Sequence, residues 1–457
     1  MQRRLTIAII IAVVALGSIF VHASHAAEPQ PHIVLVLADD LGPGDLSCYG
    51  GDIAETPNLD RLARDGTRFT QYYSPAPICS PARCGIITGQ YPARWNITSF
   101  LQERKGNREC EQADFLDPVA PSLPRILKGA GYATAHVGKW HLGGGRDVVN
   151  PPKFAEYGYD VGIGTYESPE PHPKITATNW IWSDKDEVKR WDRTKFFVDR
   201  TLEFVAKHPN QPCFVNLWLD DPHTPWVPEP IPGKAEAMGA TPKKLERVLT
   251  EMDWQIGRLM DGLPKNTLLL FLSDNGPLPT FQARRTTKIR GGSKLRGSKL
   301  SLYEGGLCVP LIVRWPGQVP ATVVDNQSVL CGIDLLPTLA HIAQAQIPPK
   351  LKLDGENMVS SFFGKPIPRE QPLYWEYGRN ETSFKYPAGA DRSPPLAMLH
   401  NGWKLLMQAD GSGAELYNLA RETEMLNEVK FELERAVEMG EKLSAWKKSL
   451  PKLPMAK

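Results

Sequence analysis

The residues of this chain that could do chemistry begin with a thiol and a guanidinium. Cys79 stands four residues before Arg83 in the pentapeptide Cys79-Ser80-Pro81-Ala82-Arg83, within a weakly polar stretch that we expect to form a loop. A sulfur atom near a fixed positive charge is a candidate nucleophile toward an anionic substrate. The pentapeptide is short, so its meaning depends on which other polar residues the fold brings to it.

Carboxylate and amide side chains follow two apolar segments of the chain. Asp39 and Asp40 come after residues 32–38, and Asp274 and Asn275 come after residues 268–273. Both segments are typical of strands buried on both faces of a parallel sheet. Oxygen-only ligands suit a hard cation such as Ca²⁺ or Mg²⁺ and not zinc. One such pair after a strand more often caps a helix or solvates a turn, but two strand ends favour a metal site.

Strand and helix patterns alternate through the first 370 residues. Two more strands are predicted at 213–219 and 309–313, and His223 follows the first of them. Helices are predicted after Thr56 up to Gly66, and at 122–128, 194–207, 242–262 and 334–343. This alternation predicts an α/β fold with a large, mainly parallel sheet covered by helices on both sides. In such sheets ligands bind beyond the carboxyl ends of the strands, where these polar residues fall.

The pattern changes near residue 370. Short strands are predicted at 373–377, 397–400, 404–408 and 415–419, with a hairpin turn at 410–413 and a last helix at about 428–448. We therefore predict a large domain at 28–370 and a small C-terminal α+β domain with an antiparallel sheet at 371–457.

Residues 1–27 have the pattern of a signal peptide. Arg3 and Arg4 precede an apolar run at 5–21, and small residues lead to a cleavage point after Ala26 or Ala27. An uncleaved membrane anchor is the alternative reading, although the run is at the short limit for a span. No later stretch is long and apolar enough to cross a bilayer, so we predict an exported protein, periplasmic or extracellular, with no stable membrane span.

Charge and cysteine content narrow the function further. The formal net charge is +2, from 53 basic and 51 acidic residues, which argues against a nucleic-acid binder. The chain has seven cysteines, an odd count that suggests one thiol with a separate fate. The other six could form up to three disulfides or stay reduced in the core.

Over nearly all of the predicted mature chain, the sequence resembles the type I sulfatases of the alkaline phosphatase-like superfamily. The resemblance rests on seven motifs in the family's order: Ala38-Asp39-Asp40; the C-x-P-x-R pentapeptide at Cys79 with Thr88-Gly89; Gly138-Lys139-Trp140-His141-Leu142-Gly143; Pro222-His223; Ser273-Asp274-Asn275-Gly276; Lys299; and Glu304-Gly305-Gly306-Leu307-Cys308-Val309-Pro310. It implies that a maturation enzyme oxidises Cys79 to formylglycine, whose hydrate attacks a sulfate ester.

The resemblance also implies the cationic groups of the site. Asp39, Asp40, Asp274 and Asn275 would hold a divalent cation, with Ca²⁺ favoured and Mg²⁺ as the alternative. Sulfuryl transfer places negative charge on the equatorial and leaving oxygens, so fixed cations are needed. Arg83, Lys139 and Lys299 would supply them, and Arg83 would also orient the aldehyde hydrate. Lys294 competes with Lys299 for this assignment.

Two histidines would divide the proton transfers, as they do in the family. His223, with Lys299, would protonate the leaving alcohol, while Asp274 would help to deprotonate the attacking hydroxyl. His141 would then take the proton of the second hydroxyl, which expels sulfate and restores the aldehyde. Taken singly, each histidine could equally well be a structural residue that is held by hydrogen bonds.

A basic segment and several tryptophans suggest the kind of substrate. Residues 275–303 contain no Asp or Glu but seven Lys or Arg, among them Arg284 and Arg285. Trp226 lies close to His223 and could stack on a sugar face. Alternatively, the basic segment is a solvated loop and the tryptophans are packing residues of the core. Together these features favour a sulfated carbohydrate over a small sulfated molecule.

Several other functions remain open from the sequence. A phosphomonoester or phosphonate hydrolase would use the same superfamily fold, and a non-catalytic sulfated-glycan-binding protein would keep the fold without the chemistry. Cysteine phosphatases use a thiol nucleophile, but their arginine follows the cysteine by six residues, not four. A disulfide between Cys79 and Cys84 is a further alternative, which Pro81 does not exclude.

Overall fold

The computed structural model describes residues 30–175, 186–229, 239–278, 295–380, 382–383, 389–421 and 424–451. The predicted signal peptide and the residues Arg284, Arg285 and Lys294 lie outside these ranges. Within them, every helix is too short or too polar to cross a membrane.

An eight-stranded sheet forms the centre of the larger part of the molecule. Its strand order is β5 (Val161–Gly164), β4 (Ala133–Gly138), β6 (Cys213–Trp218), β1 (His32–Ala38), β7 (Thr267–Ser273), β8 (Leu311–Arg314), β2 (Thr67–Phe69) and β9 (Val323–Asp325). All neighbours pair in parallel except β8, which is antiparallel to both β7 and β2. The predicted large, mainly parallel sheet is confirmed.

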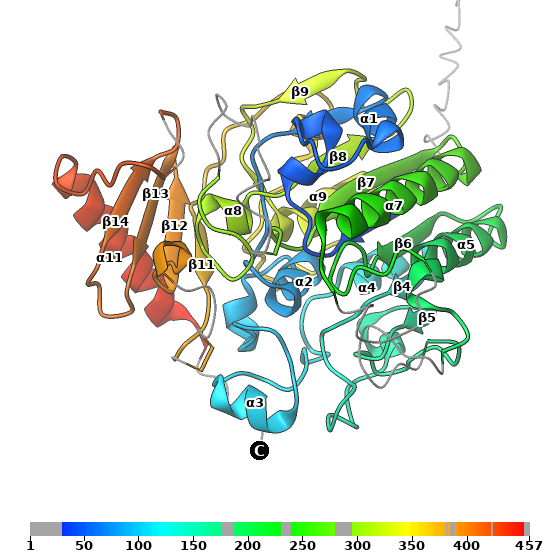
Figure 1. Cartoon of the computed structure of the whole chain (residues 1–457), viewed down its shortest axis with the longest axis horizontal. Coiled ribbons are helices and arrows are strands. Elements are labelled where there is room, and N and C mark those ends of the chain that lie inside the picture. Colours follow the sequence, from blue (N-terminus) through cyan, green and yellow to red (C-terminus); the bar gives the residue numbers. More distant parts are fainter. Residues whose placement is uncertain are drawn as a thin grey trace, which may run out of the picture.

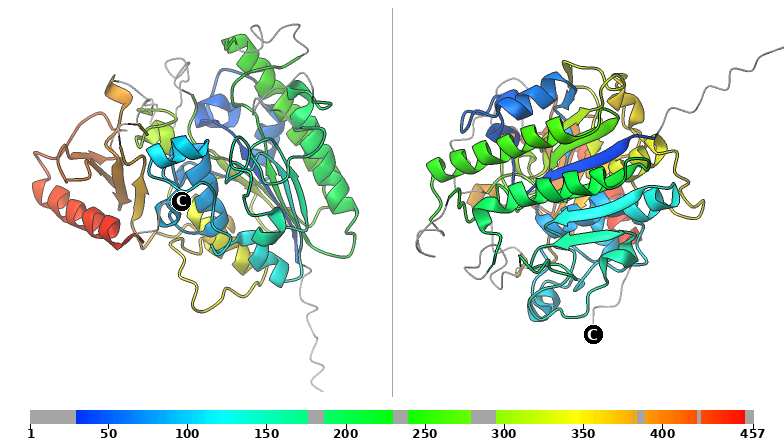
Figure 2. Two further views of the ribbon diagram at one scale, coloured as in Figure 1. Left: turned by 90° about the horizontal axis from the view of Figure 1, so that it is seen from below. Right: turned by 90° about the vertical axis from the view of Figure 1, so that its right-hand side faces the viewer.

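Helices cover both faces of this sheet (Figures 1 and 2). The side chains of Val34 and Val36 pack with α1 (Pro57–Arg64), α5 (Arg193–Ala206) and α7 (Pro242–Gly262). Ile33 and Leu35, which alternate with them, pack with α2 (Cys79–Thr88), α4 (Leu123–Gly129) and α9 (Leu335–Ile342). Successive residues of a strand point to opposite faces, so a strand covered on both sides must be apolar where it is buried, as β1 is from residue 33 to residue 38.

The pentapeptide is helical, not the loop that we expected. Cys79 is the first residue of α2, and the helix ends where Gly89 takes a φ of 63°. Pro81 is the third helical residue, where a backbone N–H has no partner within the helix, so its ring breaks no hydrogen bond. All ten residues of α2 are buried. Burial against the sheet, and not local sequence pattern, therefore places the helix here.

A four-stranded antiparallel sheet forms the smaller C-terminal part, as predicted. Its strands are β11 (Leu373–Glu376), β12 (Leu396–His400), β13 (Trp403–Met407) and β14 (Glu415–Asn418), with α11 (Leu433–Ser449) packed against them. One apolar cluster joins Leu443 of α11, Trp375 of β11 and Tyr73 of the larger part. The division of the chain at residues 370 and 371 stays a prediction.

Short elements connect these layers. They are β3 (Tyr72–Tyr73), β10 (Leu330–Cys331), α3 (Arg104–Glu109), α8 (Glu304–Leu307) and α10 (Val359–Phe362). All seven cysteines are free thiols, so the alternative of a disulfide between Cys79 and Cys84 has no support.

Candidate active site

The ten residues predicted for catalysis and metal binding are all buried, and they lie where four adjacent strands and helix α2 meet. Lys139 and His141 follow β4, His223 follows β6, Asp39 and Asp40 follow β1, Asp274 and Asn275 follow β7, Cys79 and Arg83 lie on α2, and Lys299 precedes α8. Neighbouring strands lie about 4.8 Å apart, so the carboxyl ends of β4, β6, β1 and β7 bring these residues together.

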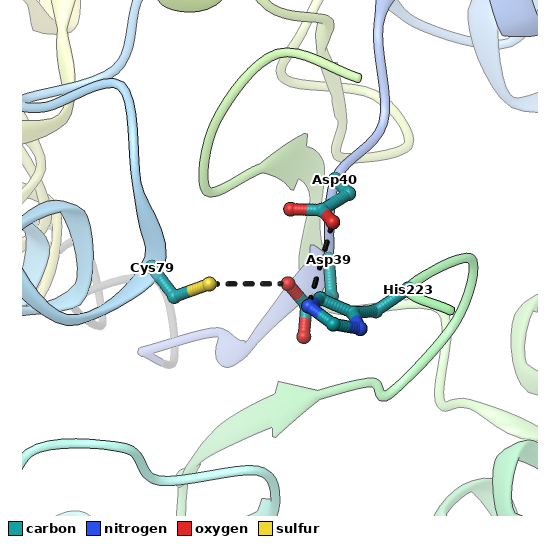
Figure 3. A group of neighbouring side chains, drawn as sticks. All are labelled: Asp39, Asp40, Cys79 and His223. Atoms are coloured by element: carbon teal, nitrogen blue, oxygen red, sulfur yellow. Dashed lines mark hydrogen bonds and ion pairs between the residues drawn. The ribbon is translucent and has the colours of Figure 1, made fainter. Parts of the chain in front are cut away.

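Cys79 faces the acidic end of β1 (Figure 3). Its Sγ lies 3.6 Å from Oδ1 of Asp39 and 3.6 Å from Nζ of Lys139. Only 2% of the residue is exposed. Burial raises the pKa of the thiol to about 12, outweighing the nearby lysines that favour the thiolate. An unmodified cysteine here is therefore neutral at pH 7 and a poor nucleophile.

Arg83 lies one helical turn after Cys79, on the same face of α2. Its Nε and Nη2 donate to Oδ2 of Asp274 at 3.0 and 2.7 Å, and its Nη1 donates to the carbonyl oxygen of Lys139 at 2.9 Å. The guanidinium carbon lies 5.2 Å from the ring centre of Trp218. The four-residue spacing thus places a rigidly held cation beside the sulfur atom.

Two lysines bind the carboxylates that follow β1. Nζ of Lys139 donates to Asp39, and Nζ of Lys299 lies 2.7 and 2.8 Å from the two carboxylate oxygens of Asp40. Burial alone would favour neutral amines, but these carboxylates outweigh it and raise the pKa of both lysines. Before Lys139 the backbone passes so close to β6 that a Cβ at Gly138 would lie 1.8 Å from a carbonyl oxygen. Only glycine fits there.

His223 contacts the same carboxylate as Lys299. Its Nε2 lies 3.5 Å from Oδ2 of Asp40, and its Nδ1 donates to the carbonyl oxygen of Thr224 at 2.6 Å. Burial, together with the charge of Lys299, lowers the pKa of His223 to about 4. Arg190, which the sequence reasoning missed, holds this loop: Nη2 donates to the carbonyl oxygens of Asp220 and His223 at 3.0 and 3.1 Å.

His141 is held by a carbonyl and a carboxylate. Its Nε2 lies 3.0 Å from the carbonyl oxygen of Leu101, to which it donates, and 3.3 Å from Oε2 of Glu167. Nη2 of Arg146 lies 2.7 Å from the other oxygen of Glu167. Nδ1 of His141 is buried and has no hydrogen-bond partner in the described part of the chain. Burial and nearby cations lower the pKa of His141, so the ring is neutral and Nδ1 is free to accept a proton.

The donor set at the ends of β1 and β7 fits a hard cation. Asp39, Asp40, Cys79 and His223 each offer one atom within 4.8 Å of the others. Nδ2 of Asn275 donates to Oδ1 of Asp40 at 2.7 Å, while Oδ1 of Asn275 is buried without a hydrogen-bond partner among the described residues. A buried, unsatisfied amide oxygen beside two carboxylates is what an oxygen-coordinated cation would satisfy.

The structure does not support every predicted substrate contact. Trp226 is only 1% exposed, packs in the core, and donates its indole N–H to the carbonyl oxygen of Pro222 at 2.6 Å. It therefore presents no free face on which a sugar could stack, and we leave it out of the substrate contacts. Arg284 and Arg285 lie outside the described residues.

Fold and site together define a hydrolase of the alkaline phosphatase-like superfamily. Residues 31–345 match the sulfatase family, and residues 298–449 match the C-terminal region of N-sulphoglucosamine sulphohydrolase. The chain belongs to the sulfatase family and is a sulfuric ester hydrolase.

Individual relatives agree with this assignment. The chain is similar to an N-acetylgalactosamine-6-O-sulfatase of Bacteroides thetaiotaomicron, with 28% identity covering 85% of this chain and 84% of the relative. It is 30% identical to N-acetylgalactosamine-6-sulfatase of Rattus norvegicus, covering 77% of this chain and 70% of that protein. The fold is similar to that of a solved structure from work on the metabolism of multiple glycosaminoglycans by Bacteroides thetaiotaomicron. The two chains are 25% identical and superpose with a TM-score of 0.72, and the match covers 92% of this chain and 100% of that one.

Proposed function

We propose that this protein hydrolyses sulfate esters of a sulfated carbohydrate, using a formylglycine formed from Cys79 by a maturation enzyme. The observation that carries the proposal is the position of Cys79, with Sγ 3.6 Å from both Asp39 and Lys139 and with Arg83 one helical turn away. We further propose that residues 1–27 direct export, so that the enzyme acts in the periplasm or outside the cell.

In the first step, one hydroxyl of the aldehyde hydrate at position 79 gives its proton to Asp274 and attacks the sulfur atom, and the bond from sulfur to the alcohol oxygen breaks as that oxygen takes up a proton. Lys299 and His223 both contact Asp40, so the proton comes from this pair. Because the pKa of Lys299 is raised and that of His223 is lowered, the ammonium is the group that holds a proton before substrate binds. Arg83 and Lys139 stabilise the negative charge that develops on the sulfuryl oxygens.

In the second step, His141 takes the proton of the remaining hydroxyl through Nδ1. The carbon–oxygen double bond forms again, the bond from carbon to the sulfated oxygen breaks, and sulfate leaves. Asp39, Asp40, Asp274 and Asn275 would hold a divalent cation, for which we favour Ca²⁺, and this ion would draw negative charge from the bound sulfate group. A geminal diol is useful because it releases sulfate without attack of water at sulfur.

The carbohydrate assignment has two supports. Two similar proteins are named as sulfatases of N-acetylgalactosamine, and the segment that precedes Lys299 is rich in Lys and Arg. Within that segment we keep Arg284 and Arg285 as proposed contacts of an anionic sugar chain.

Peptide mass measurement at position 79 tests the nucleophile directly. Conversion replaces the CH₂SH group with a lighter CHO group, and we expect this change in active, natively produced protein. Finding only thiol or disulfide in active protein would overturn the proposal. Turnover of a panel containing sulfated sugars, an aryl sulfate, a phosphate monoester and a phosphonate monoester tests the substrate. We expect the highest kcat/KM on a sulfated sugar, and a preference for either phosphorus ester would favour the rival hydrolase.

Replacing Glu167 with Gln is expected to lower kcat by about 10- to 100-fold, in the range for residues that orient a catalytic group. The carboxylate would no longer fix the imidazole of His141, so the step that releases sulfate slows most. We expect a burst of alcohol release ahead of slower turnover in stopped-flow measurements, with KM falling along with kcat, because kcat/KM reports the first step and should change little.

The control for this prediction is Glu170→Gln, which removes the same charge from an exposed side chain nearby. It should leave kcat unchanged, and Glu167→Asp should recover part of the activity. A fall in melting temperature with no burst would instead assign Glu167 a purely structural role.

A further inference from the structure

A large cleft lies outside the site described above. It has a volume of about 1010 Å³ and lies between one edge of the large sheet and the small C-terminal sheet. Arg68, Gln71 and Asn326 line it from the β2 and β9 side, and His400, Asn401 and Arg421 line it from the β12, β13 and β14 side. None of the ten residues of the candidate active site lines it. We call it the arginine cleft.

The lining of the arginine cleft carries positive charge. Among the described residues, it includes three arginines and one histidine but no Asp or Glu. The guanidinium of Arg68 lies 4.8 Å from the ring centre of Tyr49 and has no carboxylate partner within the described residues. The side chain of Arg421 is 74% exposed, and its nearest carboxylate oxygen, on Glu428, is 3.8 Å away. A concave surface lined by charge of one sign concentrates counter-ions and anionic ligands.

The third arginine is partly committed to the fold. Nη1 and Nη2 of Arg369 both lie 2.7 Å from Asp334, but its Nε is buried and has no hydrogen-bond partner among the described residues. Guanidinium groups bind the oxygens of sulfate and phosphate groups through paired N–H donors. The cleft therefore offers two largely uncommitted guanidiniums, those of Arg68 and Arg421, to an anion.

Neutral amides indicate that the anion is attached to a larger polar molecule. Asn326, Gln327 and Asn401 line the cleft beside the apolar side chains of Leu399 and Val329. Amide groups can both donate to and accept from hydroxyls, as a sugar requires. The volume is at the upper end of the range for small-molecule sites, about 300–1,000 Å³, so a segment of several sugar units fits better than a single ion.

The cleft lies near the carboxyl ends of β2 and β9, and the candidate active site lies at the carboxyl ends of other strands of the same sheet. Strand β2 runs parallel to β1 and is three strands away from it, which corresponds to about 14 Å. The chain that follows β2 connects the two places. Tyr73, which lines the cleft, binds Glu304, and the next residue, Ser74, donates to the carbonyl oxygen of Asp274.

We propose that the arginine cleft is an accessory binding site for a second sulfated segment of the carbohydrate chain whose sulfate ester is hydrolysed at position 79. This inference rests on the proposed function. An accessory site of this kind holds a long substrate near the reacting group without touching it, so it lowers KM for long substrates and leaves kcat unchanged.

Steady-state kinetics of the double variant Arg68→Gln/Arg421→Gln tests the proposal. With a hexasaccharide that carries N-acetylgalactosamine 6-sulfate, KM should rise roughly tenfold while kcat stays the same, as expected for the loss of charge-assisted contacts. With a small aryl sulfate, both constants should be unchanged. The matched control Lys207→Gln/Lys265→Gln removes the same charge from exposed side chains near the amino ends of β6 and β7, away from the cleft. It should behave as the unaltered enzyme.

Each other outcome overturns the accessory site. An unchanged KM for the hexasaccharide would show that the cleft does not bind it, and an equal loss on the aryl sulfate would show that the substitutions disturb the active site. Arg421→Gln alone alters only an exposed side chain, so it serves if the double variant folds poorly, and it should raise KM in the same direction.

A direct measurement of binding distinguishes failure of the accessory site from failure of the proposed function. Calorimetric titration of Cys79→Ala protein with the hexasaccharide needs no turnover, and its affinity should fall when the two arginines are replaced. Inactivity of the enzyme on every sulfate ester, with this binding intact, would overturn the function and not the cleft. Inorganic sulfate that bound with the same arginine dependence and equal affinity would identify a simple anion site and overturn the saccharide assignment.

Discussion

Cys79→Ser is expected to react once and stop, whereas Cys79→Ala is expected not to react at all. A serine hydroxyl at this position could attack sulfur in the first step, but the resulting sulfate ester has no second hydroxyl from which to expel sulfate. Turnover should fall about 10⁴- to 10⁶-fold in both variants, the range for loss of a catalytic nucleophile. After incubation with an aryl sulfate, peptide mass should show one added sulfuryl group at position 79 in the serine variant only.

The other thiol of α2 supplies the control for this experiment. Cys84 is buried five residues after Cys79 and packs in the core with Ile86 and Ile87. Cys84→Ala should therefore lose some stability, about 1 kcal/mol for the small volume removed, and keep its turnover. Turnover by the Cys79→Ala variant at the rate of the unaltered enzyme would exclude position 79 as the source of the nucleophile.

Local sequence signals account for the parts of the fold that were predicted well. Strand β1 was predicted to the residue because an unbroken apolar run ends at Asp39, and α7 because Thr241 and Pro242 mark its start. Strand β4 was not predicted, since Ala133, Ala135 and His136 are not typical strand residues. His136 lies among aromatic rings, with its ring 5.0 Å from that of Phe154, and burial lowers its pKa to about 3. Its place in a strand follows from packing that only the folded chain supplies.

In the candidate site too, local features could be predicted from the sequence, whereas contacts between distant residues could not. The four-residue spacing of Cys79 and Arg83 and the acidic strand ends are local, so they could be read from the sequence. Glu167 and Arg190 could not, because each acts on a histidine more than 20 residues away in the chain. No spacing pattern connects such partners. They become visible only in the fold, which places Glu167, after β5, beside the end of β4, and Arg190, before α5, beside the end of β6.

The two histidines should respond differently to substitution, and this difference tests their division of labour. In His141→Ala the attack on sulfur is intact but the second hydroxyl keeps its proton, so sulfate release becomes slow. We expect kcat to fall about 10²- to 10⁴-fold, the range for loss of a general base. Stopped-flow assays with a nitrophenyl sulfate should show a burst of one alcohol per active site, and the sulfated enzyme should be detectable by mass.

His223→Ala should instead slow the first step, because the leaving oxygen loses one member of the pair of Lys299 and His223 that delivers its proton. No burst is expected, and the loss should be greater for a sugar sulfate than for a nitrophenyl sulfate, since nitrophenolate leaves without a proton. His208→Gln, which alters a ring at the opposite edge of the sheet, should leave both reactions unchanged. A burst in His223→Ala and none in His141→Ala would reverse the two roles, because the phase in which alcohol appears identifies the step that each imidazole serves.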